Sequence, residues 1–467
     1  MRRLIDIGST FEVPLYMTSF SLPKLEKPAI AALLLLALAV PIYAASSYEG
    51  TSEVSVSRWL ALYIVGTEVA VIFLALFSGW QPLVSFKRLP GHVRIAFILW
   101  LVGASAATAF SSHSQFSGTF QLFWFIHGLF SLALWAMIKS QWVGIERALL
   151  IYISGGLIFH SIMVYFVAIF VLGLSLEAWE PYSVGTTNPR LYTFYAAVLL
   201  GIGLGFLIAE TENPLRILSI ICIFSAYHLF AWSGGRASFG TSIIVPMVVA
   251  MLAAKARKRI VLTTVACASI AYPLSLFTAP THEIYGFKSI MGGIAADSTG
   301  DAYSSGRFDI WARMLSQSLE KPLFGHGQIG TLDLLDEMLP GAALNAHNAV
   351  VHILHAWGAF GLVAFAIGVV PFLPTIGDRL ETNPRVAWPA FSSLLALGAT
   401  STLDGTLFYN QPLFFCALFL AILASVPVDP RQDTSNSGER GWDRRHLETR
   451  RHRRNRMGCG RPIQFQS

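Results

Sequence analysis

Runs of apolar residues, each close to the roughly twenty residues that a helix needs to cross a bilayer, recur along almost the whole chain of 467 residues. Because 54% of the residues are hydrophobic and only 13% are charged, no room is left for a large water-soluble domain. The sequence therefore predicts an all-α polytopic membrane protein with about twelve transmembrane helices. We place them at about 29–46, 58–79, 94–111, 117–138, 148–174, 191–209, 216–234, 237–254, 260–279, 348–373, 386–403 and 411–428.

The first run ends in Ala-Ala-Ser-Ser, which is also typical of a cleaved signal sequence. The polar leader before it is long for a signal sequence and further spans follow, so we interpret the run as the first transmembrane helix. The chain then divides into a cytoplasmic N-terminal segment, spans one to nine, one large outer loop, spans ten to twelve and a basic tail: 1–28, 29–279, 280–347, 348–428 and 429–467.

Loop charge sets the orientation, because lysines and arginines near span ends stay on the cytoplasmic side. With both termini in the cytoplasm, 26 of the 33 lysines and arginines lie inside. The basic tail carries ten of these arginines, and we expect it to be disordered and lipid-facing. It has almost no interleaved aromatic residues that could stack on bases, so nucleic-acid binding is not predicted. The outer side keeps seven cations: Arg58, Arg190, Arg236, Lys288, Arg307, Arg313 and Lys321.

The outer loop contains a segment with helical periodicity that begins at Arg307 and ends before Lys321-Pro322. Its apolar residues Phe308, Trp311, Leu315 and Leu319 recur at helical spacing, and its polar residues fall elsewhere on the helix. The sequence predicts an amphipathic helix over 307–320 that lies along the membrane surface.

Three of the outer arginines, Arg190, Arg236 and Arg307, come at or near predicted outer helix ends. A guanidinium group stays protonated and presents a planar fork that matches phosphate oxygens in pairs. A single arginine there is more often an interfacial residue whose charge reaches the headgroups. Three on one face, with His347 at the start of a span, favour a site for an anionic ligand.

His347 begins a run of histidines that continues with His352 and His355. At the membrane surface, His347 suits a general base, since its charge changes near neutral pH. His355 lies about 12 Å deeper than His347 along a straight helix, too far to share one ion. No partner carboxylate is obvious for His352 and His355, and three of the four cysteines lie inside apolar runs. We therefore predict no metal site. Glu68, inside the second span, is the other intramembrane charge, and the sequence assigns it no role.

Several short motifs between about 300 and 365 together resemble the signature of the O-antigen ligase and polymerase superfamily. They are Ser305-Gly306-Arg307 with Trp311 four residues on, Pro322-Leu323-Phe324-Gly325-x-Gly327, and His347-Asn348 with Gly358 and Gly361 downstream. The resemblance implies a membrane glycosyltransferase fold of about twelve helices in the bacterial inner membrane, with its large periplasmic loop between helices nine and ten.

The same resemblance implies transfer of a glycan from an undecaprenyl-diphosphate carrier to a sugar hydroxyl of lipid A-core, without a metal or another cofactor. Arg307, His347 and Arg236 match the family's catalytic positions, with Arg190 a looser match for substrate binding. Asn348 and Trp311 are the other substrate-binding residues that we expect. His347 is the predicted base, Arg236 and Arg307 the predicted diphosphate ligands, and the helix 307–320 is expected to close over the donor.

Three other functions stay open. A polymerase of the same superfamily would add the glycan to another lipid-linked repeat. The sequence does not separate these acceptors from a protein that accepts the glycan. A secondary transporter usually shows two similar halves and a long inner loop midway, whereas the largest loop here is outer and late. A scaffold protein of an export complex would not need the outer arginines.

Overall fold

The computed structural model describes residues 62–141, 145–171, 173, 192–209, 213–279, 286–295, 307–331, 346–402, 405 and 409–428. The first predicted span, the N-terminal segment before it and the basic tail lie outside these residues. Within the described ranges every regular element is a helix. The predicted all-α class is therefore confirmed for this part of the chain.

Eleven helices lie on the predicted spans from the second to the twelfth. By length and composition, seven helices are apolar enough to cross a membrane, or eight if α3 and the short α4 (Pro82–Arg88), bent by 95°, form one span. The total of twelve stays a prediction. In chain order, the eleven are α3 (Leu62–Phe77), α5 (Gly91–Ala109), α6 (Ser114–Gln141), α7 (Ile145–Phe166, continued by the π-helix η1, Val167–Val171), α9 (Tyr192–Ala209), α10 (Asn213–Ser233), α11 (Arg236–Leu252), α12 (Arg257–Thr278, after the 3₁₀ turn η3, Ala254–Ala256), α17 (Ala349–Val369, continued by η4, Val370–Phe372), α19 (Pro384–Ser401) and α20 (Asn410–Ser425).

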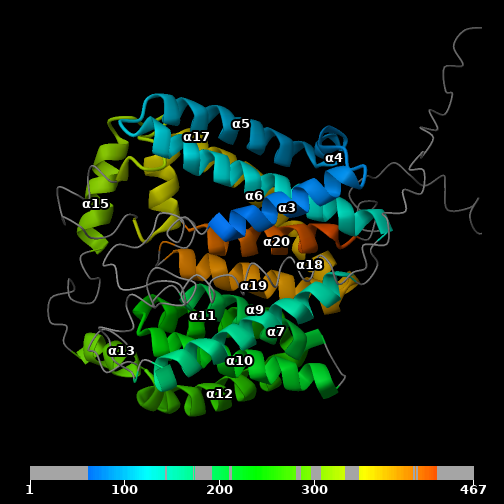
Figure 1. Ribbon diagram of the computed structural model, residues 1–467, viewed down its shortest axis with the longest axis vertical. Coiled ribbons are helices and arrows are strands. Elements are labelled where there is room, and N and C mark those ends of the chain that lie inside the picture. The colour runs from blue at the N-terminus through cyan, green and yellow to red at the C-terminus, as the bar shows by residue number, and fades with distance from the viewer. Residues whose placement is uncertain are drawn as a thin grey trace, which may run out of the picture. The chain divides into compact units, whose positions relative to one another are not determined.

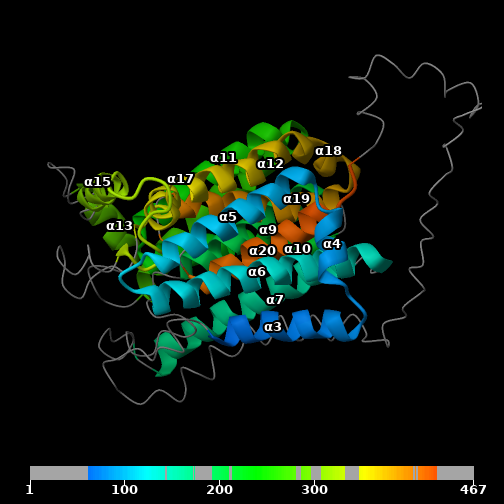
Figure 2. The ribbon, with the colours of Figure 1, turned by 90° about the horizontal axis from the view of Figure 1, so that it is seen from above.

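Short helices lie at the two ends of this bundle (Figure 1). The helices α13 (Gly286–Ala295) and α15 (Arg307–Ser318) lie at one end, whereas α4 and α18 (Pro374–Thr382) lie at the other, and the view in Figure 2 agrees. The predicted outer loop thus supplies one end of the bundle. The basic segments Lys87-Arg88 and Arg379 belong to the opposite end, as the predicted orientation requires.

Helix α9 is the centre of the packing, because every residue from Tyr192 to Leu207 is buried. Two glycines one turn apart let the backbone of α19 approach closely. A Cβ atom at Gly201 would lie 2.3 Å from Ser393 Cα, and one at Gly205 would lie 2.2 Å from the nitrogen of Pro389. No larger residue fits at either position, so this contact depends on glycine.

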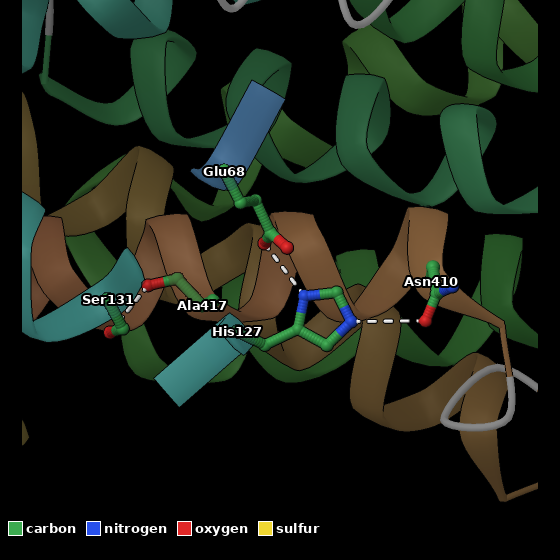
Figure 3. A network of polar contacts seen from close by, with 5 residues as sticks. All are labelled: Glu68, His127, Ser131, Asn410 and Ala417. Carbon is green, nitrogen blue, oxygen red and sulfur yellow. Dashed lines mark hydrogen bonds and ion pairs between the residues drawn. The ribbon is translucent and has the colours of Figure 1, made fainter. Parts of the chain in front are cut away.

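Glu68 belongs to a buried polar cluster between α3, α6 and α20 (Figure 3). His127 Nδ1 lies 2.7 Å from Glu68 Oε1, and His127 Nε2 lies 3.2 Å from Asn410 Oδ1. The carboxyl group is fully buried, and its second oxygen has no hydrogen-bond partner. The charge that the sequence left without a role therefore joins the peripheral helix α3 to the rest of the bundle.

Arg379 in α18 caps the carboxyl end of α20. Its Nη1 donates to the carbonyl oxygens of Leu423 and Ala424, both at 3.0 Å, and also to that of Val426. A cation suits this end of the helix, because the last carbonyl groups carry the negative end of the helix dipole. A residue that we counted for its charge alone thus also holds two helices together.

Candidate functional site

The predicted amphipathic helix is present as α15, which begins at Arg307 and ends at Ser318. It runs crosswise to the long helices, at the end of the bundle where α13 also lies (Figure 1). A helix in this direction lies along a membrane surface if the bundle helices cross the membrane.

Helix α15 has two apolar sides, and the predicted row of apolar residues is the outward one. Phe308, Leu315 and Leu319 are 56%, 44% and 80% exposed. The inward side consists of Ile310 and Met314, which pack with Ala346 and Val351. Of the expected row, only Trp311 joins the inward cluster, whereas Phe308, Leu315 and Leu319 face away from the protein.

Trp311 fixes α15 to the residue that precedes His347. The indole Nε1 donates a hydrogen bond of 2.6 Å to the carbonyl oxygen of Ala346. Arg307 shares a helix face with Trp311, Met314 and Ser318, at spacings of four, seven and eleven residues. Arg307 thus lies on the side of α15 that is turned toward residue 346, and its side chain is half-buried.

His347 has a backbone φ of +48°, and it is the only residue other than glycine with a positive φ in the described ranges. Histidine adopts this left-handed conformation at a cost of order 1–3 kcal/mol, and such residues cluster at functional sites. The side chain is half-buried. This is the strongest local sign of a site that the structure adds to the sequence.

Asn348 starts α17 as its N-cap. Its Oδ1 accepts hydrogen bonds from the backbone nitrogens of Val350 and Val351, at 2.9 and 3.1 Å. Its Nδ2 donates to the carbonyl oxygen of Thr402 at 3.0 Å, just after α19. Asn348 and Trp311 thus both make bonds within the protein that hold His347 in place, and their contact with a substrate stays a prediction.

Arg236 is the first residue of α11, after a tight turn from α10. Gly234 has a φ of +69°, and a Cβ at Gly235 would lie 2.6 Å from Ser238 Oγ, so the two glycines make the turn possible. Thr241, about 7.5 Å further along α11, lies 3.3 Å from Thr400 of α19. Since Asn348 bonds to Thr402 of the same helix end, Arg236 lies at the end of the bundle where α17 starts.

Helix α17 is not the single straight span that the sequence predicts. It consists of two helical parts that meet at Gly358, whose φ of +60° and ψ of −156° are not helical. The first part lies beside α15 and crosswise to the bundle, and the second lies along α5 (Figure 1). Kinks of this kind need partners for the freed backbone groups.

The motif Pro322–Gly327 supplies these partners. The nitrogens of His326 and Gly327 donate to the carbonyl oxygens of His355 and Ala356, both at 2.9 Å. In return, the nitrogens of Ala359 and Phe360 donate to the carbonyl oxygens of Pro322 and Leu323, at 2.8 and 3.1 Å. The two signature motifs thus meet backbone to backbone.

The side chains of His326 and His355 stack at this junction, with ring centroids 4.7 Å apart. Both rings reach Gln317 in the last turn of α15: His326 Nε2 lies 2.9 Å from its carbonyl oxygen, and His355 Nε2 lies 3.0 Å from its Oε1. The described residues contain no group of three histidine, cysteine, aspartate or glutamate side chains that could hold a metal ion. Gln317 lies in the predicted amphipathic helix and His326 within the motif Pro322–Gly327, but neither was predicted as a site residue, because their contacts with His355 depend on the kink of α17.

Arg190 lies outside the described residues. The other five predicted site residues come from α11, α15 and the start of α17.

Residues 219–366 match the family model of the O-antigen ligase. This match covers 148 of the 467 residues, and over them the chain is similar to the O-antigen ligase superfamily. A search of curated proteins finds no significant match. The matched segment begins within α10 and ends within the second part of α17, so it includes Arg236, Arg307, His347 and the junction around Gly358, but not Arg190. The match and the apolar helices support a multi-pass membrane protein with a segment similar to the O-antigen ligase family.

Proposed function

We propose that this protein transfers a glycan from undecaprenyl diphosphate to a sugar hydroxyl of lipid A-core at the periplasmic face of the bacterial inner membrane. The observation that supports the proposal is that Arg236, Arg307 and His347 belong to elements at the same end of the bundle. Arg236 begins α11, Arg307 begins α15 and His347 precedes α17. Hydrogen bonds join α11 and Asn348 to the end of α19, and Trp311 of α15 to Ala346. Two guanidinium groups and an imidazole suit a diphosphate leaving group and a hydroxyl nucleophile.

In the proposed reaction, His347 takes the proton of the acceptor hydroxyl while the hydroxyl oxygen attacks the anomeric carbon of the donor. The bond between that carbon and the diphosphate oxygen breaks, and the electron pair leaves with the diphosphate. Arg307 and Arg236 hold the diphosphate, with Arg190 assisting, so its developing negative charge meets fixed positive charges. A single displacement of this kind inverts the anomeric centre.

The outward side of α15 suits a lipid-linked donor. Phe308, Leu315 and Leu319 offer an exposed apolar row on a helix that runs along the bundle's outer end. Arg307 lies on the inward side of the helix, which it shares with Trp311 and Met314. The polyprenyl chain would contact the apolar row from the bilayer while the diphosphate lies at the arginines.

The test is glycan transfer by the purified protein in vesicles, with a lipid-linked glycan as donor, lipid A-core as acceptor and a chelator present. We expect His347→Ala to lower the rate at least a hundredfold, because general base catalysis contributes about 10²–10⁴-fold. Full transfer by folded His347→Ala would exclude His347 as the base.

A strain that lacks the gene separates ligation from polymerisation. Loss of all long lipopolysaccharide bands, with lipid-linked polymer retained, identifies a ligase. Lipopolysaccharide with a single repeat identifies a polymerase, which the family match accommodates equally.

A further inference from the structure

Helix α15 is held at both of its ends. Near its start, Trp311 donates to the carbonyl oxygen of Ala346 at 2.6 Å. In its last turn, Gln317 receives hydrogen bonds at its backbone oxygen from His326 and at its side-chain oxygen from His355. Just beyond, Lys321 Nζ donates to the carbonyl oxygen of Phe110 at 3.2 Å. A surface helix that moves as a lid would have to break several of these bonds at once.

The two histidines that contact Gln317 are held in place by their surroundings. His326 and His355 stack on each other, and four backbone hydrogen bonds join their two segments. The glycines at this junction leave no free space: a Cβ at Gly325 would lie 2.5 Å from the carbonyl oxygen of His355, and one at Gly358 would lie 2.5 Å from the carbonyl carbon of Leu323. The close approach of the two backbones therefore fixes where both imidazole rings stand.

These hydrogen bonds also determine which ring nitrogen of His326 and of His355 carries the hydrogen. Each Nε2 faces an oxygen that only accepts, so each Nε2 carries the hydrogen and donates it to Gln317. The His355 ring is completely buried. Removal of the Gln317 side-chain oxygen would leave a buried N–H group without its acceptor, which disfavours the clamped position of α15.

We infer that Gln317, His326 and His355 are positioning residues that clamp α15 onto the kink of α17, so that α15 is a fixed wall of the site and not a lid. This inference rests on the proposed roles of Arg307 and His347. It replaces the expectation that the helix closes over the donor. The donor then enters laterally from the bilayer, and Arg307 is already in place when it arrives.

The first experiment measures the position of α15 without any activity assay. Spin labels are placed at Ala312, which is exposed on α15, and at Ile95, which is exposed near the far end of α5. The protein background has its four cysteines replaced, and distances are measured by pulsed electron resonance in lipid vesicles. We expect one narrow distance distribution, unchanged when the vesicles contain undecaprenyl diphosphate.

Two substitutions at the clamp supply the contrast. Gln317→Met keeps the shape but removes the acceptor, and we expect a broad distribution. Gln317→Glu keeps an acceptor for His355, and we expect the narrow one. Ser316→Ala, at an exposed neighbouring position, is the matched control. If Gln317→Met does not fold, His326→Ala removes the bond to the backbone oxygen from a half-exposed side chain and gives the same contrast.

The second experiment measures transfer kinetics of the same variants. Misplacement of a catalytic group by about 1 Å costs up to a hundredfold in rate, so we expect kcat of Gln317→Met to fall about 10–100-fold with KM for the donor within about twofold. Gln317→Glu should recover most of kcat. A narrow distribution in Gln317→Met, or a shift in the wild type with undecaprenyl diphosphate, overturns the clamp. Absence of transfer by the wild type overturns the proposed function alone, since the distance measurement still decides the clamp.

Discussion

His347 has an imidazole side chain and a backbone with a positive φ. Substitutions can test the side chain and the backbone conformation separately. The spacing of His347-Asn348 before an apolar run indicated a residue at a helix start, and Asn348 as N-cap confirms that much. The positive φ of His347 could not be predicted, because it depends on bonds from Trp311 and to Thr402, which lie far away along the chain.

We expect His347→Gly to leave thermal stability nearly unchanged while it removes transfer. Glycine relieves the left-handed strain of about 1–2 kcal/mol, but it loses about 0.5–1 kcal/mol more backbone entropy on folding. His347→Val, which is β-branched, should lower the melting temperature clearly. Melting of the detergent-solubilised variants measures this; equal melting of all three would mean that the backbone at this position is not strained.

The structural role of Glu68 depends on its contact with His127. The sequence marked Glu68 as an unusual charge but could not reveal its contact, because His127 lies 59 residues away and Asn410 lies 283 residues beyond that. Neither helix periodicity nor spacing connects such positions.

We expect His127→Leu to destabilise the protein by about 3 kcal/mol, because it leaves a buried carboxylate without its partner. The double variant Glu68→Leu/His127→Leu should recover much of the loss, since both polar groups are then gone. Thermal unfolding in detergent measures both. Equal loss in the single and double variants would show that the pair is not coupled.

At the scale of elements, apolar runs predict where helices lie but not where they break. The eleven helices that lie on predicted spans, and the helix over 307–318, follow directly from periodicity and length. The kink at Gly358 does not, because glycine is common in membrane helices and a kink forms only where another segment satisfies the freed backbone groups. Here that segment is Pro322–Gly327. The short helices α4, α13 and α18 were missed because each is too short to span and follows or precedes a loop.

We expect Gly358→Ala to destabilise the protein strongly, by more than about 2 kcal/mol. The new Cβ would lie 2.5 Å from backbone atoms of Leu323, and alanine does not favour a φ of +60°. Gly398→Ala in α19, where no atom lies within 4 Å of the added Cβ, is the control and should be neutral. The yield of monodisperse protein and its melting temperature report the difference; a well-folded Gly358→Ala would argue against the kink.

At the scale of the whole molecule, the distribution of charge predicted which end of the bundle faces the cytoplasm. The structure places α13 and α15 at one end and α4 and α18 at the other, as that orientation requires (Figure 2). Hydropathy alone could not locate the site within the outer end, because the hydrogen bonds that assemble it connect α11, α15, α17 and α19 over more than a hundred residues.

The orientation itself is open to a direct measurement. In a background without the native cysteines, Arg313→Cys on α15 should react with a membrane-impermeant maleimide added to spheroplasts. Lys255→Cys in η3 should react only after permeabilisation, because it belongs to the predicted cytoplasmic side. The reverse pattern would place the arginines and His347 in the cytoplasm and exclude a periplasmic reaction.

The complete burial of α9 bears on how the chain is made. Its glycine groove fits the backbone of α19, which the ribosome delivers only after nearly two hundred further residues. The contact between α9 and α19 therefore forms only after α19 has been made, and a nascent chain that stops before Pro384 lacks it.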